Sequence, residues 1–536
     1  MHESECLITG GTVVGSGDDG GGDEPRQRDV WIRGEKIVAV EEPGLIAPDG
    51  RTVVDASGLI VTPGFIDTHS HADNAPLLPE DDTSKILQGV TTEVVGNCGF
   101  SLAPCSAEHQ HTLARLLERI FPPTPLDWRE WSELDTQLES GGSVTNYAPL
   151  VGHGTLRIAA FGMVDRAPDG DELAAMRRGL HDALEAGVFG LSTGLIYPPG
   201  VYSTTEEITR LAEVLGPDRV YATHMRGESD GLLDSIDEAL RIGRNAGCPV
   251  HISHLKWFGK HNWGRMPDAL DLISAAAEAG LPVTDDVYPY TAGSTFLASC
   301  LPPPLLVDGD EAVLAKLRDP AQRGHIARTI AEGLPGWDNM VANSGWDGIL
   351  VSTTASHAYE GLTLAQIGQK LRVAPVDALI HVLVEERLQA SMVAFGLSED
   401  DMIRVLAYPR TMVGSDSLPP GRGGRPHPRT YGTFPRYLGG YVRDREVLPL
   451  GEAVHRITAM PAATFRIPDR GQVRPGYIAD LVAFDPERLT DHCDYLDPVQ
   501  HPTGIAWVML AGEMVAEGGR FLGRRRGRRL TPGSTL

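Results

Sequence analysis

Positive charge is scarce in this sequence, and long apolar runs are missing from it. Its 536 residues carry 47 lysines and arginines against 72 aspartates and glutamates, a formal net charge of −25. Proteins that bind nucleic-acid phosphates rely on lysine and arginine, so this balance argues against nucleic acid as a partner. No stretch approaches the roughly 20 apolar residues that span a bilayer, which argues against a membrane protein.

Cysteines are few and scattered, without the spacing of a disulfide-rich scaffold. The six are Cys6, Cys98, Cys105, Cys248, Cys300 and Cys493. The start of the chain, residues 1–6, lacks the basic region and apolar core of a signal peptide. Both features fit a reduced compartment, and we expect a cytoplasmic protein. The basic cluster Arg524–Arg529 is an exception to the acidic background, and we expect it to be a solvated tail.

Short strand-like segments gather at both ends of the chain. They are residues 7–14, 29–40, 52–61, 479–484 and 505–515. Residues 29–40 are expected to form a hairpin that turns at Gly34 and Glu35. Two β-rich ends around a different middle predict one small β-sandwich domain, assembled from residues 1–62 and from residues 466–536, which include the basic tail.

Between these ends, from residue 63 to residue 465, strand-like and helix-like segments alternate. Candidate strands are residues 91–95, 188–192, 219–224 and 249–254, and candidate helices, with apolar residues three and four apart, are 171–186 and 232–243. Such alternation favours the α/β class with a parallel sheet, most simply a (β/α)8 TIM-like barrel. A doubly wound sheet competes, but no Gly-x-Gly-x-x-Gly loop opens a helix here. The alternation breaks at about 296–350, which predicts an insertion over the barrel mouth.

Two histidines, His69 and His71, end the apolar run that begins at Val61. On a strand, residues i and i+2 point to the same face, so both imidazoles can bind one metal ion. A lone His-x-His pair more often lies at a surface or core edge. Here the pair closes a strand that the sequence predicts to be buried, and further histidines follow later strands. We therefore interpret it as half of a metal site.

Further polar side chains follow the predicted strands. They are Cys98, His224, His254 and Asp416. In a parallel barrel the carboxyl ends of all strands open on one face, so these groups are expected to converge with the histidine pair. Imidazole, thiolate and carboxylate donors suit Zn²⁺, and six donors exceed what one tetrahedral ion needs, so two ions could share a bridging ligand. His251 is expected to face away from His254, and His153 could be an outer or a substrate-facing group.

A carboxylate beside a metal-bound water has a defined chemical task. The metal lowers the pKa of the water from about 15.7 towards about 7, and the carboxylate takes its proton and passes it to a leaving group. This describes metal-assisted hydrolysis of an amide or another acyl–nitrogen bond. Asp416 is the candidate acid/base, although an aspartate in a Ser-Asp-Ser turn is more often only a turn former.

Several motifs resemble a known family. Residues 63–73, Pro-Gly-Phe-Ile-Asp-Thr-His-Ser-His-Ala-Asp, are similar to the first-strand signature of the amidohydrolase superfamily. Within that superfamily, residues 89–104, 191–199, 223–228, 252–256 and 426–436 resemble the N-acyl-D-amino-acid deacylases, also called D-aminoacylases. The matches run in order from about residue 7 to residue 485. The resemblance implies a metal-dependent (β/α)8 barrel with a small β-sandwich from both termini.

The resemblance also implies roles for individual residues. Cys98 matches the cysteine that takes the metal-bridging place filled by a carboxylated lysine in many relatives. Cys98, His224 and His254 would hold a tightly bound zinc ion. A second, weaker site would use His69, His71, Cys98 and Asp416, with Asp416 also the catalytic acid/base. Lys256, Tyr288, Ser294 and Arg429 match positions that hold the substrate's carboxylate or its surroundings, a task that suits a fixed cation fork.

The sequence thus predicts zinc-dependent hydrolysis of an N-acyl-D-amino acid, or a related N-acylated carboxylate, to a carboxylate and a free amine. Its partner is then a small acylated amino acid. A cyclic amidase of the dihydropyrimidinase or hydantoinase kind is the nearest alternative, but those enzymes generally use a bridging carboxylated lysine rather than a cysteine such as Cys98. A non-catalytic barrel that serves as a scaffold is the alternative from another class, and it would be expected to have lost several ligands.

Overall fold

The computed structural model describes residues 4–15, 24–307, 309–419 and 423–533, and in these ranges parallel strands form two sheets. One has the order β6-β7-β8, with β6 Phe65–Asp67, β7 Val90–Val95 and β8 Asn146–Pro149. The other has the order β17-β13-β12-β11-β10-β9, with β17 Thr411–Val413, β13 Val283–Val287, β12 Val250–Ile252, β11 Val220–His224, β10 Gly190–Gly194 and β9 Val151–Gly152. Only Leu150 separates β8 from β9, and Ser70 after β6 bridges in parallel to Ser417 after β17. Each edge of one sheet therefore adjoins an edge of the other, and the α/β class is confirmed.

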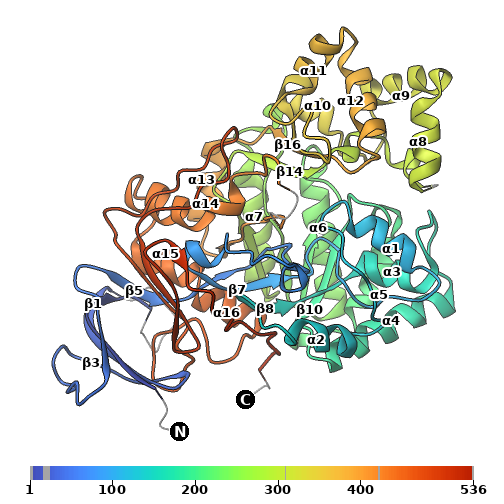
Figure 1. Cartoon of the computed structure of the whole chain (residues 1–536). Coiled ribbons are helices and arrows are strands. Elements are labelled where there is room, and N and C mark those ends of the chain that lie inside the picture. Colours follow the sequence, from blue (N-terminus) through green and yellow to red (C-terminus); the bar gives the residue numbers. More distant parts are fainter. Residues whose placement is uncertain (1–3, 16–23, 308, 420–422, 534–536) are drawn as a thin grey trace.

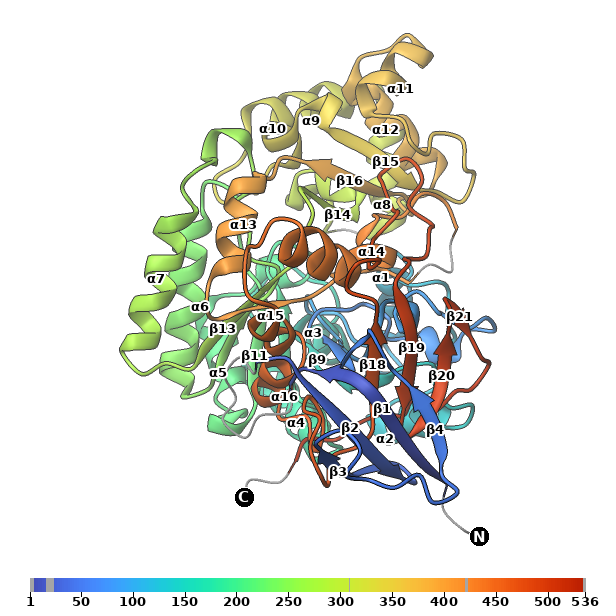
Figure 2. The ribbon, with the colours of Figure 1, turned by 90° about the vertical axis from the view of Figure 1, so that its left-hand side faces the viewer.

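Helices follow most of these strands along the chain and surround the parallel sheets (Figures 1 and 2). They are α3 His153–Phe161, α4 Gly170–Glu185, α5 Thr205–Ala212, α6 Leu232–Ala246, α7 Met266–Glu278 and α13 Glu399–Ala407. The predicted helices over 171–186 and 232–243 are confirmed as α4 and α6. A capping box starts α4, because the Asp169 side chain accepts from the backbone of Glu172 and the Glu172 side chain from the backbone of Asp169. Within the described ranges, no helix is both long and apolar enough to cross a membrane.

Strands from both ends of the chain form one antiparallel-rich sheet, blue and red in Figure 2. Its strands are β1 Glu5–Val13, β2 Arg26–Arg33, β3 Lys36–Glu41, β4 Thr52–Asp55, β5 Ile60–Pro63, β18 Leu481–Phe484, β19 Ile505–Leu510, β20 Glu513–Glu517 and β21 Arg520–Phe521. The two halves join where β5 pairs antiparallel with β18, and Val61 and Leu481 are buried together in one apolar cluster. The hairpin predicted over 29–40 is confirmed as β2 and β3, which turn through Gly34 at a φ of +58°.

The part of the chain in which the alternation breaks forms a separate antiparallel sheet, in the order β14-β16-β15. Its strands are β14 Ala292–Phe296, β16 Ser391–Phe395 and β15 Ile349–Thr353. Five helices accompany it, α8 Asp310–Arg318, α9 Pro320–Glu332, α10 Met340–Ser344, α11 Leu364–Leu371 and α12 Pro375–Glu385. These elements gather at the top of Figure 1, away from the sheet formed by the chain ends. We call residues 292–395 the inserted segment.

The basic cluster near the C-terminus is not the solvated tail that the sequence suggested. Its arginines form ion pairs with acidic residues of distant segments: Arg525 with Asp81, Arg526 with Glu513, Arg528 with Glu35 and Arg529 with Asp135. Between them Gly527 bridges to Ser143, and Leu530 is buried. The tail is therefore a strap that ties the end of the chain to α2 (Trp131–Glu139) and to the loop before β8. The remaining helices are α1 Gln110–Leu117, α14 Arg429–Pro435, α15 Leu450–Arg456 and α16 Ala459–Phe465.

Candidate metal centre and its cavity

Three of the predicted site residues have an unusual backbone. Cys98, His254 and Asp416 have φ values of +53°, +37° and +49°, in the left-handed region that residues with a Cβ rarely adopt. Each follows a parallel strand, and the kink turns its side chain back over the strand ends. Backbone strain of this kind costs on the order of 1–3 kcal/mol per residue and clusters at functional sites. The strain indicates that these three side chains are held in place for a purpose.

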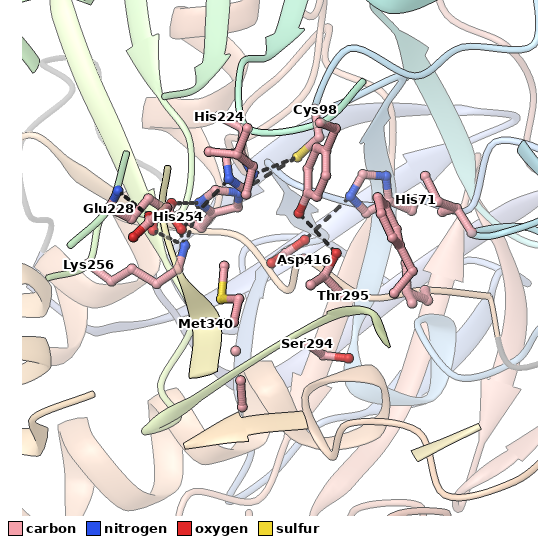
Figure 3. Close-up of a pocket in the computed structure, with 18 of the residues that line it drawn as sticks. His71, Cys98, His224, Glu228, His254, Lys256, Ser294, Thr295, Met340 and Asp416 are labelled. Atoms are coloured by element: carbon pink, nitrogen blue, oxygen red, sulfur yellow. Dashed lines mark hydrogen bonds and ion pairs between the residues drawn. The ribbon is translucent and has the colours of Figure 1, made fainter. Parts of the chain in front are cut away.

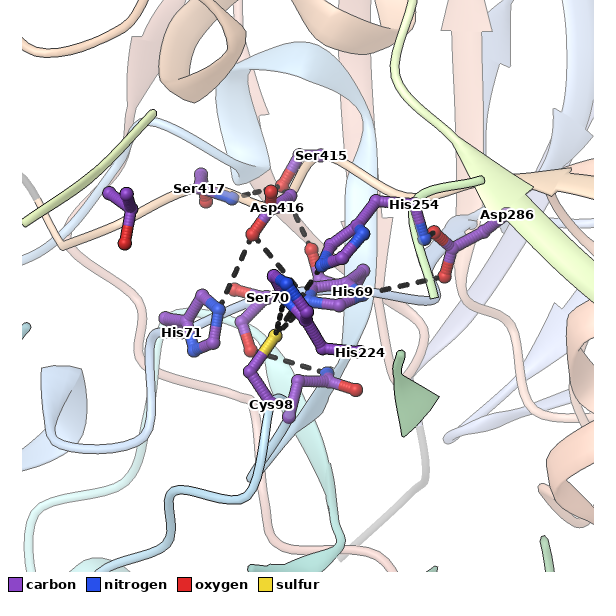
Figure 4. A network of polar contacts seen from close by, with 12 residues as sticks. His69, Ser70, His71, Cys98, His224, His254, Asp286, Ser415, Asp416 and Ser417 are labelled. Atoms are coloured by element: carbon purple, nitrogen blue, oxygen red, sulfur yellow. Dashed lines mark hydrogen bonds and ion pairs between the residues drawn. The ribbon is translucent and has the colours of Figure 1, made fainter. Parts of the chain in front are cut away.

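The predicted ligands meet in two groups that share one sulfur atom (Figure 4). His69, His71, Cys98 and Asp416 form the first group, and Cys98, His224 and His254 form the second. Within each group all the ligand atoms lie within 4.8 Å of one another. From Cys98 Sγ, the nearest nitrogen atoms are His69 Nε2 at 3.3 Å, His224 Nδ1 at 3.6 Å and His254 Nε2 at 3.6 Å. The structure thus brings together all six residues that the sequence proposed as ligands.

These spacings suit zinc. Ligands on a tetrahedral zinc lie about 2.3 Å (sulfur) and about 2.0–2.1 Å (nitrogen or oxygen) from the ion, so neighbouring donors are separated by about 3.3–3.6 Å. Asp416 Oδ1 is 3.4 Å from His71 Nε2 and 3.5 Å from His69 Nε2. Burial would raise the pKa of the Cys98 thiol, but the charge of His69 and hydrogen bonds with the neighbouring imidazoles hold it well below its usual range. A lowered thiol pKa favours the thiolate, the form that binds metal.

Two acidic residues contact the ligand histidines on the side away from the shared sulfur atom. They were not identified from the sequence. Asp286, at the end of β13, accepts from the backbone of His254 at 2.6 Å and lies 3.6 Å from His69 Nδ1. It also contacts His251 Nε2 at 2.8 Å, so His251 faces Asp286 rather than the ligand groups, as the sequence predicted. Glu228 Oε1 lies 2.9 Å from His254 Nδ1. Carboxylates in such places fix the orientation of ligand histidines. The acidic pair 285–286, set between apolar residues, was the one sequence signal for Asp286.

All of the predicted ligands except His69 line a cavity that extends beneath the inserted segment. Lys256, Tyr288 and Ser294, three of the four predicted substrate-binding residues, also line it. Lys256 Nζ donates to Glu228 Oε1 at 2.6 Å, and this pair lies beside His224 and His254 in Figure 3. Tyr288 is buried, and its Oη has no hydrogen-bond partner among the residues that the structure describes. A cation and a hydroxyl are therefore presented to the same space as the ligands.

Arg429, the fourth predicted substrate-binding residue, lies behind Asp416 rather than in the cavity wall. Its Nη1 is 2.8 Å from Asp416 Oδ2, and its Nη2 donates to the Ser294 carbonyl at 3.2 Å. The guanidinium carbon lies 4.7 Å from the centre of the Tyr288 ring, a cation–π distance. Arg429 lines a second cavity, which shares Ile120, Ser294 and Leu418 with the first. Its charge offsets that of Asp416, and the pKa of this carboxyl is well below its usual range despite the effect of burial.

His153, which the sequence left open as an outer or substrate-facing group, does not reach the cavity. It is fully buried, and its Nε2 lies 2.8 Å from Glu207 Oε1. Arg157 binds the same carboxylate at 2.6 Å, so the three residues form a closed structural group. Cys105, Cys248 and Cys300 are also buried, and burial raises the pKa of the Cys300 thiol to about 12, as expected of an inert core residue.

Comparison with known proteins gives one consistent result. The model of the Amidohydrolase family matches residues 52–516. D-aminoacylase of Alcaligenes xylosoxydans xylosoxydans is 37% identical, with 98% of this chain and 97% of that protein covered. N-acyl-D-aspartate deacylase of the same organism is 35% identical, with 100% of this chain and 96% of that protein covered.

Solved structures agree. N-acyl-D-glutamate deacylase from Bordetella bronchiseptica, solved with zinc and a phosphonate that mimics the tetrahedral intermediate, superposes with a TM-score of 0.82 at 34% identity over 99% of this chain and 100% of that chain. D-aminoacylase, studied for the role of its binuclear metal centre, gives a TM-score of 0.80 at 36% identity, with coverages of 98% and 99%. L-hydantoinase from Arthrobacter aurescens, at 15% identity and a TM-score of 0.52, shares the fold alone.

Proposed function

Because the chain belongs to the amidohydrolase family, we propose that it hydrolyses the amide bond of N-acyl-D-amino acids, with zinc in the two ligand groups. The observation that carries the proposal is the sulfur of Cys98 at the junction of the two groups, with Asp416 beside it and Lys256 across the same cavity. Two of the most similar relatives, a D-aminoacylase and an N-acyl-D-aspartate deacylase, act on this class of compound. A linear amide next to a carboxylate fits this arrangement of ligands, acid/base and cation.

We assign one zinc ion to Cys98, His224 and His254, and a second, weaker site to His69, His71, Cys98 and Asp416. Zinc bound there would polarise the amide carbonyl and lower the pKa of water from about 15.7 towards about 7. The thiolate of Cys98 suits both sites because sulfur is a preferred zinc donor. A D-aminoacylase structure with a binuclear metal centre and a deacylase structure with zinc support this assignment.

Asp416 acts as the acid/base. The adjacent Arg429 keeps its carboxyl ionised, so Asp416 is ready to accept a proton from the attacking water. Addition of that water to the carbonyl carbon gives a tetrahedral carbon, and Asp416 then delivers the proton to the amide nitrogen as the carbon–nitrogen bond breaks. The products are a carboxylate and a free amine. Lys256 and the unpartnered hydroxyl of Tyr288 hold the substrate's own carboxylate and so place the amide over the ligand groups.

We also infer how the fold is divided. Strands β6, β7, β8 with β9, β10, β11, β12, β13 and β17 are assigned to a single (β/α)8 barrel, closed where Ser70 meets Ser417. Residues 1–62 and 466–536 are assigned to the β-sandwich domain, and residues 63–465 to the barrel. The strand pairing of β14, β15 and β16 supports an insertion that continues past the predicted limit of about 350 to Phe395.

The proposal is tested by amide hydrolysis. Zinc-loaded protein would be assayed with the N-acetyl D and L forms of methionine, phenylalanine and glutamate, together with hydantoin as a cyclic amide. We expect turnover of D forms, with a loss of at least about a hundredfold in Asp416→Asn because the proton transfer is removed. Arg474→Gln, in the loop before β18, serves as a distant charge control. Turnover of hydantoin alone would favour the cyclic amidase, and no turnover of any compound would reject the proposal.

A further inference from the structure

Away from the ligand groups, the wall of the cavity is largely apolar. Its apolar members include Phe100, Ile120, Tyr197, Phe258, Phe296 and Met340, and Arg119, Thr295 and Asp338 are polar residues of the same lining. The Tyr197 ring links these residues to the metal site, because its centre lies 5.0 Å from the His224 ring and 5.0 Å from the Phe296 ring. A substrate whose amide lies over the ligands therefore rests part of its length on this aromatic wall. Because burial of apolar surface away from water is favourable, such a wall binds an apolar group of the substrate best.

The cations of this wall are already paired. Lys256 is bound by Glu228 at 2.6 Å and is assigned to the substrate's own carboxylate, so it is not free for a second one. Arg119 is buried in the wall beside Phe296, with its guanidinium carbon 5.8 Å from the ring centre. Its Nη2 forms an ion pair with Asp310, the first residue of α8 in the inserted segment. Asp310 also binds Arg115 at 3.0 Å, and Glu118 pairs with Arg115 at 2.6 Å, so two carboxylates balance the two guanidinium groups at the edge of the cavity.

We propose that the part of the substrate on this wall is uncharged and apolar, and that Asp310 enforces this preference by neutralising Arg119. The inference rests on the proposed function and narrows its substrate class to monoanionic N-acyl-D-amino acids. A second carboxylate in the substrate would lose its water against aromatic rings without gaining a free cation, which is costly for a buried charge. Asp310 does not line the cavity, so it acts through Arg119 as a positioning residue.

A second carboxylate can come from the amino-acid side chain or from the acyl group, and the assay separates the two. We would compare kcat/KM for N-acetyl-D-methionine, N-acetyl-D-glutamate and N-succinyl-D-methionine with zinc-loaded wild-type protein. We expect the monoanion N-acetyl-D-methionine to be preferred by at least about tenfold over both dianions, since a close charge without a partner is discriminated by that much or more. Equal or better use of either dianion would overturn the inference and leave the proposed function standing. No hydrolysis of any compound would remove both.

The role of Asp310 is tested by Asp310→Asn, which uncovers the charge of Arg119. We expect the preference for the monoanion over the dianions to fall about tenfold, through a lower KM for the dianion whose carboxylate reaches Arg119. Glu311→Gln is the matched control, because Glu311 lies on the same helix and pairs with Arg387 instead. In the double variant Asp310→Asn, Arg119→Met the preference should return. The masking role would be refuted by an unchanged preference in Asp310→Asn, or by a preference that Arg119→Met does not restore. The ratio measured for the wild-type protein tests the substrate class independently of how well the variants fold.

Discussion

Arg429 forms a buried ion pair with Asp416, with Nη1 2.8 Å from Oδ2, although the sequence pointed to Arg429 as a contact of the substrate. The pair lies directly beside the ligands, because Oδ1 of the same carboxylate is 3.4 Å from His71 Nε2. The guanidinium thus orients the acid/base as well as neutralising it. Asp416 cannot turn away from the ligand groups while both of its oxygens are held.

Replacement of Arg429 by methionine keeps much of the side-chain volume and removes the charge. We expect kcat/KM to fall by about 10²–10⁴, because breaking a buried pair leaves an uncompensated carboxylate at the reacting centre. Most of the loss should appear in kcat, since the arginine lies behind Asp416 and outside the main cavity. Steady-state kinetics would check this, and a change confined to KM would indicate that Arg429 acts only on the substrate.

Cys98 is the residue common to both ligand groups, so its removal should affect both sites at once. We expect Cys98→Ala to lose both zinc ions, His224→Ala to lose the ion of its own group, and His71→Ala to retain the ion at Cys98, His224 and His254. Metal content after dialysis, measured by atomic absorption, would show the difference. Retention of one full equivalent of zinc in Cys98→Ala would contradict the shared-ligand arrangement.

Glu228 is placed to orient a ligand and a cation together, because its Oε1 contacts both His254 Nδ1 and Lys256 Nζ. Glu228→Gln keeps the shape and removes the charge. Loss of such a supporting carboxylate typically costs about 10–100-fold in metal affinity or activity, and we expect a loss in this range here. Zinc competition with a chelating dye would measure it. The neighbouring Asp230→Asn, an exposed partner of His261, is the control and should behave like the wild type.

Lys85 is a fully buried ammonium between two carboxylates, 2.6 Å from Asp67 and 3.2 Å from Glu93. It also donates to Ser415 Oγ at 2.8 Å, next to Asp416. Lys85→Met would leave two buried carboxylates without a countercharge, and we expect it to lower the free energy of unfolding by about 3–5 kcal/mol. Urea denaturation followed by circular dichroism would check the size of the effect. Wild-type stability in this variant would contradict the pairing.

The strap at the C-terminus should make stability depend on pH. Burial raises the pKa of Asp135 from 3.8 to about 6, despite the nearby charge of Arg529. A carboxyl with a raised pKa in the folded state contributes stability that is present below about pH 4 and is lost as the pH rises through about 6. Asparagine at this position does not titrate. The melting temperature of Asp135→Asn relative to the wild type should therefore increase between pH 4.5 and pH 7.5, and a constant difference would refute the raised pKa.

The sequence predicted the site residues best where these residues lie at the ends of parallel strands. Strands such as β11 have local apolar patterns, and a polar residue such as His224 at the end of one has a predictable place on a parallel sheet. The membership of the amidohydrolase superfamily predicted from these motifs is confirmed. The supporting carboxylates were missed. Glu228, for example, lies in a loop, and the sequence pattern does not indicate that this loop brings it to His254. The extent of the inserted segment was also hidden, because β14 and β16 pair across many intervening residues.

The pairing of β5 with β18 has a consequence for how the chain is made. Val61 is synthesised 422 residues before its partner Ala483. The sheet of the chain ends therefore cannot be completed until the barrel between them has been synthesised, and β5 must keep an unpaired edge for most of that time. Unpaired strand edges invite aggregation. Slower elongation should thus reduce the yield of active protein, and chaperones that shield a nascent N-terminus should restore it.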